Sequence, residues 1–481
     1  MDRFVCIHGH FYQPPRENPW LGEIERQPSA HPYHDWNERI LAECYAPNAN
    51  NYARISFNFG PTLLSWMERH ALKIYRSILG ADQQSCRLFS GHGSAMAQAY
   101  NHAILPLCND RDRVTQVVWG IRDFESRFGR RPEGLWLPET AVDLKTLDVL
   151  AEQGILFTVL APHQARCAQP EEPIDTTQPY RCKLPSGREI ALFFYHGPLA
   201  HAISFERLLD HGEQFAERLK EIAVSGNSGP RLAHIATDGE NYGHHHRFGE
   251  MALAFALDRL QNDGSVRLTN YGEYLAAHPP KQEMEIVEKS SWSCVHGVDR
   301  WWSDCGCSTG GHPGWNQAWR TPLRQALDML RDALIPRYES MAARYFKDPW
   351  AARDASIELF LTAGHVEQFW QEQAIRTLSA DEKLFARKLV ELQRNALLMY
   401  TSCAWFFDDI SRVEPLQILR YAGRVIQLAR ALFGEDLEPA FLAILEKAVS
   451  NIPQQGNGRR LYDKWVWDFS GRAERMNETT V

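Results

Sequence analysis

Residues 134–143 read GLWLPETAVD, so that a short apolar run ends at a proline and is followed at once by Glu139. An apolar run of this length indicates a buried strand. A carboxylate directly after it projects from the end of that strand. The same arrangement recurs at residues 234–246, HIATDGENYGHHH, where a run of small and apolar residues ends at Asp238. Both stretches therefore predict strands with acidic side chains at their carboxyl ends.

Apolar, β-rich runs of this kind recur through the amino-terminal half, at residues 3–7, 55–59, 86–90, 134–137, 156–160, 190–195 and 232–237. Stretches with helical spacing lie between them, at residues 62–79, 111–128, 144–152, 206–223 and 249–261. Alternating strands and helices form βαβ units and a parallel sheet. About seven strands, each ending in a polar loop, indicate an α/β fold in the form of a closed or nearly closed barrel, with its active site at the carboxyl ends of the strands.

The carboxy-terminal part of the chain has a different pattern. Residues 285–314 are rich in Cys, Trp and Gly and have no clear period, whereas long helical spacing follows at residues 321–341, 352–376, 382–407, 415–433 and 438–449. We therefore expect a (β/α) barrel over residues 1–280, a Cys- and Trp-rich loop segment near the site over 281–315, and an all-α helical bundle domain over 316–481.

Composition excludes several classes of protein. A chain of 481 residues is long enough for two or three domains. Its formal charge of −8 is spread without long runs, so neither nucleic acid nor a membrane surface is an expected partner. No apolar run approaches the ~20 residues of a membrane helix, and the amino terminus reaches histidine and proline before a signal-peptide core can form, which favours the cytoplasm. Ten cysteines in a chain of this length make no disulfide framework.

Histidines close the first predicted strand. His8 and His10 are two residues apart, so on a strand both side chains point the same way, and Gln13 follows shortly after. Such a pair can donate hydrogen bonds to a ligand, bind a metal, or be satisfied core histidines. The spacing alone leaves these three interpretations open.

Four motifs carry a family resemblance: HGHFYQP, GHGSAMAQAYNHAILP, GLWLPETA and ATDGENYG, in this order over about residues 1–275. In them the chain resembles glycoside hydrolase family 57. The resemblance implies an incomplete (β/α)7 barrel and a retaining mechanism on α-glucans, as amylase, 4-α-glucanotransferase, branching enzyme or debranching enzyme. It places the nucleophile at Glu139 and the acid/base at Asp238. No cofactor is implied, and an α-glucan is the expected partner.

The retaining mechanism requires unlike protonation of two carboxyl groups about 5 to 5.5 Å apart. Glu139 must be ionised and Asp238 protonated at the start. An Asp in water has a pKa of about 3.9, and burial together with the negative charge of a nearby Glu139 raises it. We therefore expect the pKa of Asp238 to be high in the folded protein.

Other side chains are expected to contact the substrate. Trp136 is either a stacking platform for a sugar or, as strand tryptophans usually are, part of the core. Tryptophans of the Cys- and Trp-rich segment could line distal subsites. The full set of expected substrate-binding residues is His8, His10, Gln13, His92, His102, Trp136, Glu240, His245, His246, Trp292, Trp301 and Trp302.

The Cys- and Trp-rich segment also holds side chains that zinc prefers, namely Cys294, His296, Cys305, Cys307 and His312. The Cys-x-Cys spacing differs from the usual Cys-x2-Cys, and the sequence offers no partner knuckle. A compact loop without a metal explains the same residues, so the sequence assigns no metal ligand.

Two other classes of protein stay open. A metal-dependent carbohydrate deacetylase needs an Asp-Asp pair beside His-x3-His ligands, for which the sequence offers only single histidines. A non-catalytic glycan-binding protein does not need both Glu139 and Asp238. Metal analysis tests the first class, and loss of activity with retained binding in Glu139→Gln tests the second.

Overall fold

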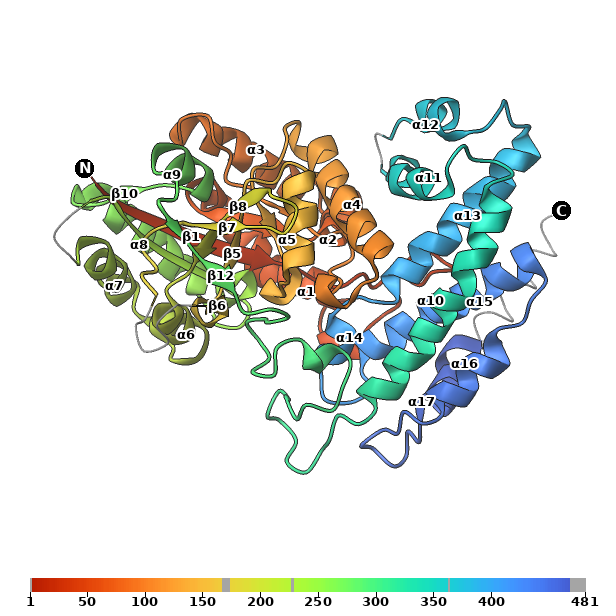
Figure 1. Cartoon of the computed structure of the whole chain (residues 1–481). Helices are drawn as coiled ribbons and strands as arrows, with labels where there is room; N and C mark the ends of the chain where they lie inside the picture. The colour runs from red at the N-terminus through yellow and green to blue at the C-terminus, as the bar shows by residue number, and fades with distance from the viewer. Residues whose placement is uncertain (1, 167–173, 226–228, 362–363, 468–481) are drawn as a thin grey trace. The chain divides into compact units, whose positions relative to one another are not determined.

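The computed structural model describes residues 2–166, 174–225, 229–361 and 364–467 (Figure 1). Its contacts divide the chain into two compact units. The first comprises Met1–Pro15, Arg26–Tyr100 and Gly120–Ser293, and the second comprises Arg16–Glu25, Asn101–Trp119 and Cys294–Val481. The predicted domain limits at residues 280 and 316 stay predictions, and residues 468–481 of the predicted helical domain lie outside the described residues.

The first unit is built around β1 (Arg3–Phe11), which is buried along almost its whole length. β1 pairs in parallel with β9 (Arg231–Asp238) from end to end. Its other edge is shared by β10 (Arg267–Leu268) and β2 (Ser56–Phe59), both also parallel. A strand covered on both faces and paired on both edges reads as a continuous apolar run, which explains the sequence pattern of β1.

The parallel pairing continues away from β2. Single bridges join Phe57 to Ala95 and Gly134 to Phe157. Between and beyond these bridges, β3 (Ala97–Gln98) pairs with β4 (Leu135–Trp136), and β5 (Phe157–Leu160) pairs with β8 (Glu189–Phe194). The strand order is therefore β9-β1-β2-β3-β4-β5-β8. This confirms the predicted α/β class, whereas the count of (β/α) repeats stays a prediction.

Helices connect these strands, as the alternating pattern predicted, and Figure 1 shows them around the sheet. They are α1 (Trp36–Ile40), α2 (Pro61–His70), α3 (Leu72–Leu88), α4 (Asp110–Phe128), α5 (Leu144–Glu152), α6 (Gly197–Phe205), α7 (Gly212–Val224), α8 (Gly249–Asp263) and α9 (Tyr271–Ala277). β7 (Tyr180–Lys183) and β11 (Gln282–Glu283) extend the sheet beyond β8, whereas β6 (Ala165–Arg166) and β12 (Glu285–Ile286) form a separate two-stranded sheet. The helix predicted at 62–79 is broken into α2 and α3, and the one predicted at 206–223 begins only at Gly212, after a short 3-10 turn at Leu208–Asp210.

The strand predicted at residues 86–90 is wrong. Helix α3 continues through Leu88, because Tyr75, Ile78 and Ala81 bury one helical face at spacings of three. The strand of this βα unit is instead β3, nine residues later. Residues 91–96 therefore precede a strand rather than follow one. They lie at the amino ends of the strands and not at the carboxyl ends, where the active site is expected.

The second unit is helical. Helices α10 (Arg320–Ala342), α13 (Ala380–Leu398) and α15 (Val413–Phe433) pack against one another, and α16 (Glu438–Leu445) packs on α10. Shorter helices complete it: α11 (Pro349–Ala355), α12 (Val366–Gln373), α14 (Cys403–Phe406) and α17 (Gly458–Tyr462). The predicted helical region is confirmed, although the helix expected at 352–376 is broken. Within the part of the chain that the structure describes, no helix is long and apolar enough to cross a membrane.

A buried ion pair fixes where β3 begins. Asp82 on α3 is almost fully buried and accepts hydrogen bonds from Arg130 Nε at 2.9 Å and Nη2 at 2.7 Å. The same carboxylate accepts from the backbone N–H of Ala95 at 2.8 Å, and Arg130 Nη2 donates to the Ala95 carbonyl at 2.9 Å. Because both atoms of the Ala95 backbone are held, the register of β3 depends on this pair.

We predict that Asp82→Ala lowers the free energy of unfolding by about 3 kcal/mol, because Arg130 is left without its counter-charge in a mostly buried place. Calorimetry should show a melting temperature lower by several degrees. The control is Arg122→Ala, which breaks the exposed pair between Arg122 and Glu125 and should change stability by no more than about 0.5 kcal/mol. Equal effects of the two substitutions would contradict the assignment.

Candidate active site

Four polar side chains form a row at the carboxyl ends of neighbouring strands. His10 on β1 is in register with Asp238 on β9 and with Asn58 on β2. Residues in register on parallel strands point to the same face of a sheet, so the three side chains stand side by side. Asn58 Nδ2 donates to Gln98 Oε1 on β3 at 2.6 Å, which extends the row by one strand. Strands distant in sequence thus place their polar ends together.

Both histidines of β1 point to this face, which confirms the prediction that they share one side of the strand. The rings of His8 and His10 stack on Trp136, with centroids 4.7 and 5.1 Å away. His8 Nδ1 lies 3.0 Å from Ser56 Oγ, and each ring contacts the amide of Asn58. Burial lowers the pKa of both histidines to about 3, so both imidazoles are neutral near pH 7.

Trp136 is fully buried beneath these two imidazoles. Its ring supports the histidine rings from below and packs edge-on against Trp292, with centroids 5.2 Å apart. The structure therefore places Trp136 in the core, the second of the two interpretations open in the sequence. It offers no exposed face on which a sugar could stack.

The turn after β4 has an uncommon backbone conformation. Glu139 and Thr140 are both left-handed, with φ of 58° and 50°. This costs roughly 1–2 kcal/mol for each residue with a Cβ atom. Gln164 holds the turn, because Thr140 Oγ1 donates to its Oε1 at 2.8 Å and its Nε2 donates to the Thr140 carbonyl at 2.8 Å. Such strain persists only where surrounding contacts over-determine the geometry, and it concentrates at functional sites.

The carboxylate of Glu139 is held by the chain segment 290–293. Trp292 Nε1 donates to Glu139 Oε2 at 3.0 Å, and Ser293 Oγ donates to the same oxygen at 2.6 Å. The backbone N–H of Trp292 also donates to the Glu139 carbonyl at 3.1 Å. Two donors on one carboxylate oxygen stabilise the ionised form. The predicted loop segment reaches the site at these residues.

Asp238 has the opposite environment. The residue is accessible to solvent at the end of β9, yet protein atoms surround its carboxyl group closely. Burial of the carboxyl group raises the pKa of Asp238 well above its usual range, and the negative charges of Glu240 and Glu139 raise it further. The direction expected from the sequence is confirmed.

Glu240 supports the rim of the site. Its Oε1 accepts hydrogen bonds from Tyr45 Oη at 2.6 Å and from the backbone N–H of Tyr12 at 3.1 Å. Gln13, which bonds the Tyr12 carbonyl through Nε2 at 2.9 Å, also bonds Glu240. Burial raises the pKa of Glu240 to about 7, against the opposing effect of these donors. Glu240 and Gln13 thus join the end of β1 to the loop after β9.

For three of the expected substrate-binding residues of the first unit, His92, His245 and His246, the structure shows no bond to the row within the described residues. His92 lies at the amino ends of the strands, where Nδ1 pairs with Glu133 Oε2 at 2.8 Å and the residue lines a cavity of about 300 Å³ with Phe4. His246 Nε2 contacts the carbonyl of Ser204 at 3.1 Å. The neighbouring His245 is exposed at the residue level, although the protein atoms close to its ring, together with His244 and His246, lower its pKa to about 4.

Three further candidates belong to the second unit. His102 is buried, and its Nδ1 lies 2.6 Å from Ser402 Oγ. Trp301 is fully buried, whereas Trp302 is exposed and donates from Nε1 to Asp299 at 2.9 Å. Their expected contact with the substrate therefore stays a prediction.

Several residues of the site were missed in the sequence. Asn58 lies near the carboxyl end of the strand predicted at residues 55–59, and a polar residue at that place could have been recognised as a site residue. Gln98 gave no signal, because β3 has only two residues. The remaining contributors come from loops and from the end of β8: Gln164, Tyr195 and Ser293.

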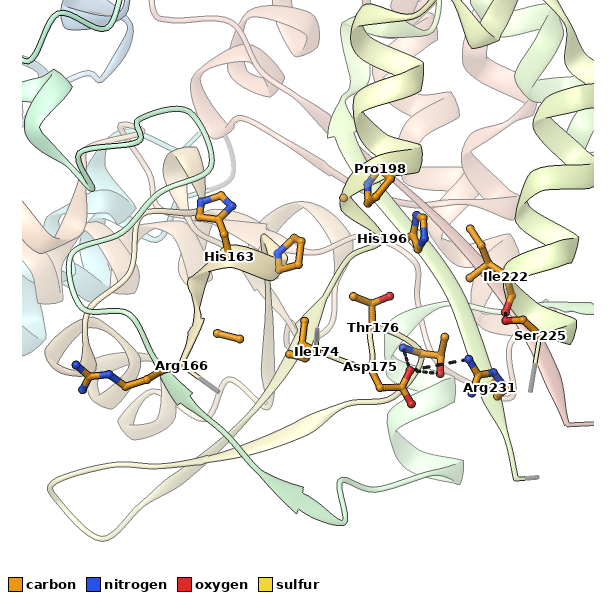
Figure 2. A pocket seen from close by; sticks show the side chains of 14 residues that line it. His163, Arg166, Ile174, Asp175, Thr176, His196, Pro198, Ile222, Ser225 and Arg231 are labelled. Atoms are coloured by element: carbon orange, nitrogen blue, oxygen red, sulfur yellow. Dashed lines mark hydrogen bonds and ion pairs between the residues drawn. The ribbon is translucent and has the colours of Figure 1, made fainter. Parts of the chain in front are cut away.

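A separate cavity of about 720 Å³ lies in the first unit (Figure 2). His163, His196 and Ile222 are among its lining residues, and Asp175 and Arg231 form an ion pair at its edge with 4.0 Å between Oδ1 and Nη2. Neither Glu139 nor Asp238 lines it, so the cavity is distinct from the row of polar side chains.

Side chains that could hold a metal ion occur in the second unit, at Cys294, His296, Cys305 and Cys307.

Family comparison covers most of the chain. Residues 19–287 match the family model described as glycosyl hydrolase family 57. Residues 315–478 match a domain of unknown function, DUF3536. The first match includes the strands that carry Asn58, Gln98, Glu139 and Asp238.

Two curated relatives are α-amylases. Alpha-amylase 1 of Dictyoglomus thermophilum is 24% identical over 216 residues, which cover 43% of this chain and 29% of the relative. An alpha-amylase of Pyrococcus horikoshii is 23% identical over 304 residues, which cover 61% of this chain and 44% of the relative. The chain spans less than half the length of each.

Solved structures share the fold over nearly the whole chain. An exo-type maltose-forming amylase from Pyrococcus sp. ST04 superposes with a TM-score of 0.70 at 16% identity, covering 92% of this chain and 83% of its own. A family 57 branching enzyme from Pyrococcus horikoshii gives 0.60 at 17% identity, covering 93% and 95%. A 4-alpha-glucanotransferase from Thermococcus litoralis gives 0.56 at 15% identity, covering 90% and 60%. With the family match over residues 19–287, these findings establish that the chain belongs to glycosyl hydrolase family 57.

Proposed function

We propose that this protein is a retaining enzyme that acts on α-1,4-linked glucans through a covalent glycosyl-enzyme intermediate, as an amylase or a 4-α-glucanotransferase. The observation that carries the proposal is the unlike environment of two carboxyl groups. Two hydrogen-bond donors favour the ionised form of Glu139, whereas burial and two neighbouring acids favour the protonated form of Asp238. Two carboxyl groups whose environments favour opposite protonation states suit the roles of nucleophile and general acid.

In the proposed mechanism, a carboxylate oxygen of Glu139 attacks the anomeric carbon of the bound sugar. Asp238 gives its proton to the departing glycosidic oxygen in the same step. Asp238, now ionised, then takes a proton from the incoming water or sugar hydroxyl, which attacks the intermediate and releases Glu139. Water as acceptor gives hydrolysis, and a sugar hydroxyl gives transfer.

The polar row next to Asp238 fits an uncharged substrate. His10 is neutral, because its pKa is about 3, and the buried amides of Asn58 and Gln98, which are also neutral, hold its ring in place. Neutral hydrogen-bonding groups on rigid strands can be matched to sugar hydroxyls without burying an unpaired charge. Trp292 and Tyr195 form an aromatic wall, with ring centroids 6.4 Å apart.

The relatives support the substrate class. Their names include amylases, a branching enzyme and a 4-alpha-glucanotransferase, and all of these act on α-linked glucans. The choice between hydrolysis and transfer depends on how well water is excluded from the intermediate. We place branching or debranching second, because both curated relatives are α-amylases.

We predict that Glu139→Gln reduces activity on maltoheptaose and amylose by about three orders of magnitude or more, and that Asp238→Asn reduces it by about 10²–10⁴-fold. Product chains should be separated by chromatography with a parallel reducing-end assay. Rising reducing ends indicate hydrolysis, and longer chains at constant reducing ends indicate transfer. Proton NMR of the first product should show the α anomer.

Controls separate chemistry from folding. Glu133→Gln removes a carboxylate at the amino ends of the strands and should keep near wild-type activity. Azide added to Glu139→Ala should restore turnover of an activated α-glucoside and give a β-glycosyl azide, since azide then replaces the missing nucleophile. Active Glu139→Gln enzyme, or an inverted wild-type product, would disprove the mechanism. Glucan binding without turnover in wild type would favour the glycan-binding class.

We predict that Glu240→Gln moves the alkaline limb of the kcat/KM–pH profile to lower pH. The charge of Glu240 raises the pKa of Asp238, so its removal makes the proton of the general acid easier to lose. Glu139 and Tyr195 also face Asp238 and are unchanged in this variant. The profile should be measured beside that of Glu133→Gln, whose alkaline limb should match wild type. A limb that stays in place or moves upward would argue against Asp238 as the acid.

We predict that Trp292→Phe lowers kcat by about 10–100-fold, because the ring is kept but the charge-assisted hydrogen bond to Glu139 is lost. Ser293→Ala, which removes the other donor, should have an effect of similar size. Steady-state kinetics should place the loss mainly in kcat. A change confined to KM would mean that Trp292 contacts substrate without positioning Glu139.

A further inference from the structure

Four side chains with metal-ligating atoms converge in the second unit. The thiol sulfurs of Cys294, Cys305 and Cys307 and a ring nitrogen of His296 all lie within 4.8 Å of one another. They come as two short pairs, Cys294-x-His296 and Cys305-x-Cys307. Gly306, inside the second pair, is left-handed with φ of 79°, a conformation that glycine adopts without strain.

The separations match those of ligands around one tetrahedral ion. Cys294 Sγ lies 3.7 Å from Cys307 Sγ and 3.9 Å from Cys305 Sγ. Cys307 Sγ lies 3.6 Å from His296 Nδ1. Bonds of about 2.3 Å to sulfur and about 2.0–2.1 Å to nitrogen at tetrahedral angles place two sulfurs about 3.8 Å apart and a sulfur and a nitrogen about 3.6 Å apart.

The ligand types select zinc. Hard cations such as Mg²⁺ and Ca²⁺ take oxygen ligands, whereas three thiolates and an imidazole form a common structural zinc set. A disulfide is a poorer description, because it joins two sulfurs about 2.05 Å apart and leaves the third thiol unexplained. Four protein ligands also complete the coordination of zinc and leave no position for a substrate, which is typical of a structural site.

The surroundings fit the charge of such a site. Zn²⁺ bound by three thiolates and a neutral imidazole has a net charge of −1. Arg320 at the start of α10 is fully buried and directs Nη1 toward Cys305 Sγ at 3.9 Å, while its Nε and Nη2 find no partner in the described residues. The backbone N–H groups of His296 and Arg300 bond Cys294. Such outer contacts orient ligands and stabilise thiolates.

The local fold needs this kind of support. Residues 294–319, all of which the structure describes, contain one regular element, the short 3-10 helix η10 (Asp299–Trp301). This helix packs on α10 and α14 and buries Trp301 completely. A segment with so little regular structure has few backbone hydrogen bonds of its own, and a bound metal would add to its stability.

We propose that Cys294, His296, Cys305 and Cys307 bind one Zn²⁺ ion that fixes residues 294–307 on the helices of the second unit. Binding converts the three thiols to thiolates and releases their protons to solvent. The ion holds structure and takes no part in the chemistry at Glu139 and Asp238, so the site stands independently of the proposed function.

The test is elemental analysis of the full-length protein, purified without chelator. We expect about one zinc per chain. The double variant Cys305→Ser/Cys307→Ser should contain only background zinc. Cys86→Ser, which removes a half-buried thiol of α3 in the first unit, is the matched control and should keep its zinc. Wild-type protein reconstituted with Co²⁺ should show the ligand-field and thiolate charge-transfer bands of a tetrahedral site.

A conservative pair of variants covers the case in which the double variant does not fold. His296→Cys completes a four-cysteine set and should keep one zinc, whereas His296→Ala should lose zinc to a competing chelator at lower concentrations than wild type. Removal of zinc should lower the melting temperature of the second unit by several degrees. Folded wild-type protein that contains no zinc, that contains iron instead, or that has two of the three thiols joined as a disulfide would overturn the proposal.

Discussion

The parallel pairing of β1 with β9 on one edge and with β2 on the other places His10 between Asp238 and Asn58. Every residue of the polar row takes its position from this register, because a shift by one residue would turn each side chain to the opposite face. The backbone hydrogen bonds of buried strands are rigid, so the row is pre-arranged before any ligand arrives. The ion pair between Asp82 and Arg130 fixes the register of β3 and thereby the position of Gln98 in the row.

The turn at Glu139 adds a second constraint. Two consecutive left-handed residues are unfavourable by themselves, and the structure offsets this with Gln164 on one side and the segment 290–293 on the other. The same segment supplies the two donors, Trp292 Nε1 and Ser293 Oγ, that bond one oxygen of the Glu139 carboxylate. Backbone strain, carboxylate orientation and charge stabilisation are thus coupled through one stretch of chain about 150 residues further along. A substitution at Trp292 or Ser293 therefore acts on the geometry of Glu139.

The errors of sequence interpretation have physical causes. His92 was expected at the site because residues 86–90 resembled a strand, but helix α3 runs on and β3 begins after His92. When a strand is predicted at the wrong residues, the loop beside it is assigned to the wrong end of the sheet. The proximity of the Cys and His side chains in the Cys-rich segment was not evident from the sequence, for a different reason. The segment's two pairs are Cys-x-His and Cys-x-Cys rather than Cys-x2-Cys, and only a chain path that doubles back through η10 brings Cys294 to Cys305 and Cys307.

The sequence by itself determined the alternation of strands and helices, the helical carboxy-terminal region, and the acidic residues at the ends of β4 and β9. These features depend on local periodicity and on composition, which neighbouring residues carry. Tertiary structure alone decided which polar side chains meet. The pairing of Asn58 with Gln98, the donors from Trp292 and Ser293, the burial of Trp136 and the assignment of His102 to the second unit depend on contacts between distant segments. Packing and strand register determine those contacts, and a pattern among neighbouring residues in the sequence does not predict them.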